Sequence, residues 1–169
     1  MVNEGRLILT EKQVLQKIRR IAFEIYENNF SEKQIWIAGI HDQGYIFAQL
    51  LSREIQSIST LKVHLIQVGI NKSDPEHSEV VLDTEKPAIR GKCLILADDV
   101  LNTGKTLAYS LKSFLNQGMK KIETAVLVNR KHSLFPISAS YTGYELSTTL
   151  TEHVQVILTA DSKGVFLVD

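Results

Sequence analysis

The chain has 169 residues, enough for one domain with a single buried core and too few for two independent domains to be expected. Its 19 basic and 19 acidic residues cancel, which excludes a broad electrostatic field that would attract nucleic acid or an anionic membrane. A lone cysteine excludes an intramolecular disulfide, and the sequence shows neither a signal-peptide pattern nor an apolar run of about 20 residues, so we expect a soluble, cytoplasmic protein.

The first half of the chain alternates predicted helices and strands. Thr10 and Gln13 have the spacing of a capping box, and the residues after them repeat an apolar face with helical period. Short apolar runs between such helices are typical of buried strands in a parallel sheet. The predicted elements are a helix at about 11–28, a strand at Gln34–Ile40, a helix after Gly44 and a strand around 62–68.

The second half begins with a long irregular segment and then repeats the pattern. Residues 71–90 are rich in turn formers and show no sustained period, so we predict a mobile loop. The predicted elements after it are a strand at 93–97, a helix that Gly118 closes, a strand at 124–128, and short strands at 154–158 and 165–168.

This alternation predicts an α/β fold with a mainly parallel sheet flanked by helices. Ligands of such sheets bind in a crevice at the carboxyl ends of the strands. We therefore expect the loops at 39–44 and 98–105, with whatever follows Val128, to converge there. The tail beyond residue 135 is expected to cover this crevice.

One segment, residues 94–107 with the sequence LILADDVLNTGKTL, carries recognisable chemistry. A glycine turn at the start of a helix supplies backbone N–H donors and the favourable end of the helix dipole to a phosphate. Asp98 and Asp99 stand just before this turn, where they can accept hydrogen bonds from the cis hydroxyls of a sugar or help to hold a hydrated Mg²⁺. A phosphate next to a diol predicts a ribose phosphate, with its phosphate on Thr103, Gly104, Lys105 and Thr106.

The same segment has competing interpretations. A P-loop is excluded by spacing, because its first required glycine falls on Asp99, and a nicotinamide site is unsupported, since no G-x-G-x-x-G follows a strand. A blander interpretation makes Asp98 and Asp99 solvated and Thr103 a simple helix cap. The order of strand, acid pair, glycine turn and helix favours the ligand interpretation.

At these residues the sequence resembles the type I phosphoribosyltransferase family, whose signature is an apolar strand, two acidic residues, two apolar residues and a short x-Thr-Gly-x-Thr/Ser loop. The segment GIHDQGYIFAQLLSREI is similar to the family's pyrophosphate loop with its following helix. The segment AVLVNRKHSLFPISASYTGYEL is similar to its base-binding hood. Within the family, the chain resembles the bifunctional pyrimidine operon attenuator and uracil phosphoribosyltransferase most, and the hypoxanthine-guanine enzymes next.

The resemblance implies a glycosyltransferase that moves ribose 5-phosphate from 5-phosphoribosyl-1-pyrophosphate (PRPP) to a nucleobase and releases pyrophosphate, with Mg²⁺ bound to the PRPP. It also implies a homodimer of single domains, residues 1–169, with the hood at about 130–169. The implied catalytic residues are Asp98, Asp99 and Asn102, the acid pair contacting the ribose and, indirectly, the metal. The implied binding residues are 102–106 for the 5′-phosphate, Ile40, His41, Asp42, Gln43 and Lys72 for pyrophosphate, and Asn129, Tyr141 and Thr142 for the base.

Some positions depart from the family pattern. Asp42 is acidic where attenuator-like proteins carry basic residues, which leaves a non-catalytic sensor of PRPP or nucleotides as the alternative function. Asn102 replaces the aspartate that accepts a proton in the purine enzymes, which favours a pyrimidine base.

Other positions keep two interpretations. Tyr141 either stacks on the base or lies in the core, and Lys72 either contacts pyrophosphate or is solvated. A modest basic cluster gives weak support to RNA binding. Its residues are Lys120, Lys121, Arg130 and Lys131.

Overall fold

A computed structural model describes residues 5–84 and 88–169. Its main feature is a six-stranded sheet in the order β4-β3-β2-β5-β6-β7, in which β4 alone is antiparallel to its neighbour. The mainly parallel α/β fold is therefore confirmed. The strands of this sheet are β2 (Gln34–Ile40), β3 (Lys62–Gly69), β4 (Val81–Leu82), β5 (Cys93–Leu101), β6 (Lys121–Asn129) and β7 (Tyr141–Glu145).

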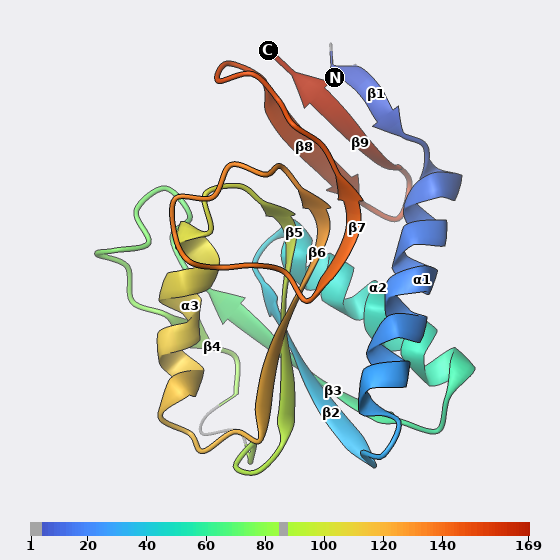
Figure 1. Cartoon of the computed structure of the whole chain (residues 1–169), viewed down its shortest axis with the longest axis vertical. Helices are drawn as coiled ribbons and strands as arrows, with labels where there is room; N and C mark the ends of the chain where they lie inside the picture. Colours follow the sequence, from blue (N-terminus) through green and yellow to red (C-terminus); the bar gives the residue numbers. More distant parts are fainter. Residues whose placement is uncertain (1–4, 85–87) are drawn as a thin grey trace.

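Helices cover both faces of this sheet, with α1 (Glu11–Asn29) and α2 (Gln43–Ile58) on one face and α3 (Lys105–Leu115) on the other (Figure 1). Because side chains alternate along a strand, β5 contributes to two separate cores. Ile95 packs in the core under α1 and α2, whereas Leu94 and Leu96 pack in the core under α3. The predicted capping box of α1 is also confirmed, with Thr10 and Gln13 bonded to each other.

A smaller antiparallel sheet lies beyond one end of the large one (Figure 1). Its strand order is β1-β9-β8, so the first and last parts of the chain pair with each other. These strands are β1 (Arg6–Leu9), β8 (His153–Leu158) and β9 (Lys163–Val168). No helix in the described ranges is both long and apolar enough to cross a membrane.

Three features of the fold differ from the sequence prediction. The hood receives β1, which no local pattern indicated, whereas β7, expected in the hood, extends the central sheet beside β6. The segment 71–90 is not wholly irregular, because β4 pairs with the edge strand β3 and Ile89 is buried. Residues 85–87 of this segment lie outside the described residues. Strand β5 continues to Leu101, so Asp98 and Asp99 lie within it rather than after it.

Candidate functional site

A pocket of about 330 Å³ lies where the carboxyl end of β5 meets the start of α3. The hood reaches it through Val154 of β8, and the segment after β3 reaches it through Lys72. The pocket thus brings together residues that three separate parts of the sequence supply. Among the predicted site residues, it is lined by Lys72, Asp98, Asp99 and residues 102–106.

The start of α3 has features that suit the binding of an anion. Gly104 occupies the N-cap position with φ +83° and has no side chain to cap the helix, while the N–H of Lys105 donates to the Thr103 hydroxyl at 3.3 Å. The N–H of Ala108 donates to the Gly104 carbonyl at 3.0 Å, so the α-helical ladder begins there and the amides of residues 105–107 precede it. Such first-turn amides, with the positive end of the helix dipole, suit a phosphate.

Glycine is needed at position 104 for two reasons. Its backbone is in the left-handed region, which side chains with a Cβ disfavour. A Cβ built there would also lie 3.3 Å from the Cβ of Ile137, closer than ordinary packing. The glycine therefore allows both the turn and the close approach of the segment after β6.

The acid pair is not solvated as the blander interpretation held. The side chain of Asp98 is 4% exposed and that of Asp99 14% exposed. Lys72 Nζ lies 2.9 Å from Asp98 Oδ1 and 3.3 Å from Asp99 Oδ1. Lys72 is therefore not simply solvated, because it bridges the two carboxylates, and its contact with pyrophosphate stays a prediction.

The surroundings of Asp98 and Lys72 shift the pKa values of these two groups. Burial, reinforced by Asp99, raises the pKa of Asp98 well above its ordinary value, and Lys72 only partly opposes this rise. Burial acts to lower the pKa of Lys72, but the two carboxylates outweigh it and the net pKa is raised. Lys72 therefore stays protonated at neutral pH and offsets part of the negative charge in the pocket.

Residues 40–43, the expected pyrophosphate loop, do not line the pocket. Ile40 is fully buried in the core, and Gln43 accepts a hydrogen bond from the backbone N–H of Leu158 in β8, at 2.9 Å. The imidazole of His41 is bonded to the side chain of Gln67 at 3.0 Å, and Asp42 is exposed at the N-cap of α2.

The loop nevertheless runs beside the acid pair. A Cβ added to Gly44 would lie 2.6 Å from Asp98 Oδ1, so a glycine is required for α2 to start this close to the carboxylate. Gly44 is a site-shaping residue that the sequence prediction did not single out. The sequence did contain a signal for it, because Gly44 interrupts the apolar stripe at the start of this helix.

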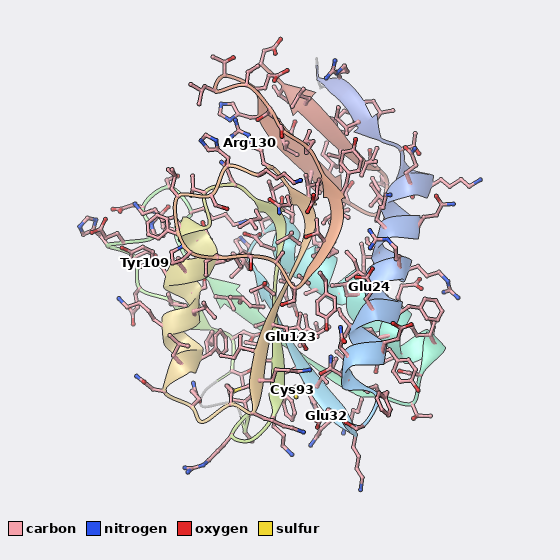
Figure 2. All side chains as sticks on the ribbon, viewed as in Figure 1. Glu24, Glu32, Cys93, Tyr109, Glu123 and Arg130 are labelled. Atoms are coloured by element: carbon pink, nitrogen blue, oxygen red, sulfur yellow. The ribbon has the colours of Figure 1, made fainter. Side chains whose placement is uncertain are left out.

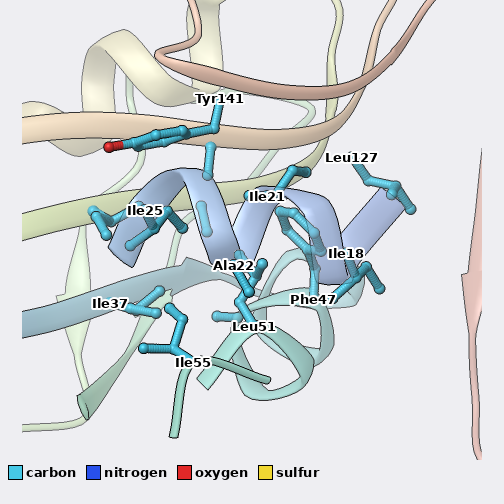
Figure 3. Packing of buried hydrophobic residues seen from close by; sticks show 14 of the residues in the cluster. Ile18, Ile21, Ala22, Ile25, Ile37, Phe47, Leu51, Ile55, Leu127 and Tyr141 are labelled. Carbon is cyan, nitrogen blue, oxygen red and sulfur yellow. The ribbon is translucent and has the colours of Figure 1, made fainter. Parts of the chain in front are cut away.

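The predicted base contacts are not found in the pocket. Tyr141 is 2% exposed, packs beside Ile21 and Ile25 of α1 (Figure 3) and donates its hydroxyl hydrogen bond to Glu123. The prediction that Tyr141 stacks on the base is therefore wrong, because its side chain faces the α1 core. Thr142 and Asn129 are also absent from the pocket lining, where Val154 presents the apolar surface of the hood instead.

The four basic residues expected to cluster lie at opposite ends of β6. Lys121 forms an ion pair with Glu123 at the beginning of the strand, whereas Lys131 pairs with Glu145 beyond its other end. Figure 2 shows the same separation between Glu123 and Arg130. Because Arg130 is itself buried, these residues do not form one basic surface.

Comparisons with known proteins agree with this geometry. The family model described as "Phosphoribosyl transferase domain" matches residues 6–163. The chain is 35% identical over 165 residues to Bifunctional protein PyrR of Brevibacillus brevis, covering 94% of this chain and 92% of the relative. It is 34% identical over 168 residues to Bifunctional protein PyrR of Geobacter sp., covering 95% and 94%.

Solved structures support the fold. The hypoxanthine phosphoribosyltransferase of Trypanosoma cruzi superposes with a TM-score of 0.79 at 17% identity, covering 96% of this chain and 95% of that chain. A hypoxanthine-guanine phosphoribosyltransferase from Bacillus anthracis gives 0.73 at 19% identity, covering 86% and 85%. At these identities the likeness is one of fold.

Proposed function

The chain belongs to the phosphoribosyl transferase domain family, and we propose that it transfers ribose 5-phosphate from PRPP to a pyrimidine base such as uracil, releasing pyrophosphate. The observation that carries this proposal is the pocket in which the N-terminus of α3 and the acid pair face one cavity. An anion site beside two carboxylates matches the phosphate and the vicinal hydroxyls of a ribose phosphate.

In this reaction the bond from C1′ of the ribose to pyrophosphate breaks as a bond from C1′ to a base nitrogen forms. Positive charge develops on the ribose ring in between, and preorganised negative groups nearby stabilise it. Asp98 and Asp99 would accept hydrogen bonds from the ribose hydroxyls and supply this charge. Lys72 bridges the two carboxylates and would have to release them when the ribose binds. Its ammonium group could then contact the departing pyrophosphate.

Mg²⁺ fits this site as an ion that arrives with PRPP. Within the described ranges, no group of three or more His, Cys, Asp or Glu side chains is arranged to hold a metal. Mg²⁺ prefers oxygen ligands, keeps several waters and is commonly bound by one or two carboxylates plus substrate phosphates. Asp98 and Asp99 would hold it, directly or through water, and the ion would neutralise the leaving pyrophosphate.

Asn102 supports a pyrimidine over a purine substrate. Its side-chain oxygen accepts a hydrogen bond from Arg130 at 3.0 Å, and an amide cannot take up a proton as a carboxylate does. A mechanism that needs a carboxylate at this position to accept the proton of the base is therefore unsupported.

The test is release of pyrophosphate from Mg²⁺-PRPP, measured with uracil, cytosine, hypoxanthine and guanine. We expect turnover with uracil at a rate at least tenfold above either purine, and loss of turnover in the double variant Asp98→Asn/Asp99→Asn. PRPP binding without turnover on any base would contradict the transferase and favour the non-catalytic sensor. The expected homodimer stays a prediction that light scattering of the purified chain measures.

A further inference from the structure

Arg130 is a buried arginine at the edge of the site. It follows β6 directly and is 5% exposed. Each of its three guanidinium nitrogens donates one hydrogen bond. Nη1 donates to Asn102 Oδ1 at 3.0 Å, Nη2 to the Thr149 carbonyl at 2.8 Å, and Nε to Thr148 Oγ1.

The acceptors of Arg130 are all neutral. Ion pairs within the described residues do not include it, and the pKa of Glu152 is lowered chiefly by hydrogen bonds from Thr149, with Arg130 a minor, longer-range cause. Removing a charge from water is costly unless a counter-charge compensates it. Arg130 thus places a buried charge, whose direct partners are all neutral, next to the loop proposed to bind phosphate.

Residues 130–137 also contact each residue of the turn 102–104. We call this turn the phosphate loop. Arg130 holds the side chain of Asn102. The backbone N–H groups of Leu134 and Phe135 both donate to the Thr103 carbonyl, at 2.9 and 3.0 Å. Gly104 is in close contact with the segment at Ile137. These contacts hold the Thr103 carbonyl toward the segment after β6.

From these contacts we propose that Arg130 is a positioning residue: through Asn102 it fixes the phosphate loop against residues 148–149, shortly before β8, in the arrangement that binds phosphate. The proposal rests on the proposed function only in that the phosphate loop binds the 5′-phosphate. It adds a residue that joins this loop to the hood and sets the affinity for the phosphate end of the substrate.

The hydrogen bond from Arg130 also explains the role of an asparagine at position 102. Because Asn102 Oδ1 accepts from Arg130, the amide group keeps its N–H donors, which suit an anion. An aspartate at this position would pair with Arg130 and consume the positive charge. Asn102→Asp should therefore raise the melting temperature of the ligand-free protein and weaken phosphate binding.

The direct test is calorimetric binding of ribose 5-phosphate to the full chain. Arg130→Gln should weaken binding about ten- to a hundredfold, the usual value of hydrogen bonds that involve a charged group. Arg130→Lys keeps the charge but lacks the planar fork that spans three acceptors, so we expect at least a threefold loss. Thr148→Val removes one acceptor outside the pocket and should cost about twofold or more, with the fold intact.

Arg20→Gln is the matched control. Arg20 also bridges two elements, donating to the carbonyls of Thr142 and Gly143 at 3.0 and 2.7 Å, but it lies away from the pocket. Ribose 5-phosphate affinity should be unchanged in this variant. An equal loss in Arg20→Gln would mean that general destabilisation, rather than positioning, explains the effect of Arg130.

Kinetics separate positioning from a general structural role. The 5′-phosphate does not react, and a contact to it that is equally strong in the ground and transition states changes KM without changing kcat. Arg130→Lys and Thr148→Val should raise KM for PRPP while kcat at saturating PRPP stays within about threefold of the wild-type value. A fall in kcat with unchanged KM would overturn the proposal.

The outcomes also separate this inference from the proposed function. If the wild-type chain binds neither ribose 5-phosphate nor inorganic phosphate, the phosphate site itself is wrong and both proposals fail. If it binds ribose 5-phosphate and both Arg130→Lys and Thr148→Val bind as tightly, only the role of Arg130 is refuted. These two variants decide the matter if Arg130→Gln does not fold.

Discussion

Asp98 is an almost completely buried ionisable carboxyl group, and this combination predicts a trade-off between stability and binding. Its raised pKa means that folding favours the protonated form, so the associated stability is complete below the ordinary aspartate pKa and is lost as pH rises through the raised value. Asp98→Asn is always neutral and keeps an oxygen acceptor for Lys72. We expect it to melt higher than wild type at pH 7, by about 2–4 °C for each kcal/mol, and to lose PRPP affinity.

Thermal melts from pH 3 to pH 8 measure the difference in melting temperature between Asp98→Asn and wild type. This difference should vanish toward pH 3, where Asp98 is protonated in both the folded and the unfolded protein. Asp99→Asn is the control, because its more exposed carboxylate should give a smaller gain. A lower melting temperature of Asp98→Asn at pH 7 would mean that attraction to Lys72 exceeds the cost of burial.

At the scale of elements, the junction of β5 and α3 depends on the conformation of one glycine. Gly104 and Gly91 both have positive φ, so alanine at either position should cost about 1 kcal/mol for the left-handed backbone. A Cβ at position 91 meets nothing within 4 Å, whereas one at position 104 presses on Ile137. Gly104→Ala should therefore lower the melting temperature further than Gly91→Ala, and it alone should weaken ribose 5-phosphate binding.

Calorimetric binding and thermal melts of the two variants provide the comparison. Equal losses of affinity would show that the fit between the phosphate loop and Ile137 does not shape the site.

At the scale of the whole molecule, the pocket joins two sheets. The central sheet supplies the acid pair through β5, and the hood supplies Val154 through β8. A further link is the hydrogen bond from Leu158 to Gln43. Mg²⁺-PRPP should therefore slow hydrogen exchange both at the start of α3 and in β8, because a ligand that binds only the folded state suppresses opening of every element it contacts.

Exchange of the wild-type chain with and without Mg²⁺-PRPP measures this protection, and the Asp98→Asn/Asp99→Asn variant should show none. Protection at α3 without any in β8 would contradict a site shared between the two sheets.

The amino-acid sequence by itself determined the α/β class and indicated the residues that line the pocket at the start of α3, because both follow from local patterns. Helical and strand periods predicted the layers, and the order of strand, acid pair, glycine turn and helix located Asp98, Asp99 and Gly104 within a few residues of one another. Only the tertiary structure decided how distant residues meet. Lys72 reaches an aspartate 26 residues away, and β1 pairs with β9 at the other end of the chain.

Local patterns also could not predict which side of the sheet a residue faces. Tyr141 belongs to the core rather than the base site because β7 pairs in parallel with β6 and directs this side chain toward α1. Arg130, expected in a basic surface cluster, is buried, and its guanidinium donates to neutral acceptors on the phosphate loop and in the segment before β8. Such contacts depend on chain segments that periodicity cannot place relative to one another.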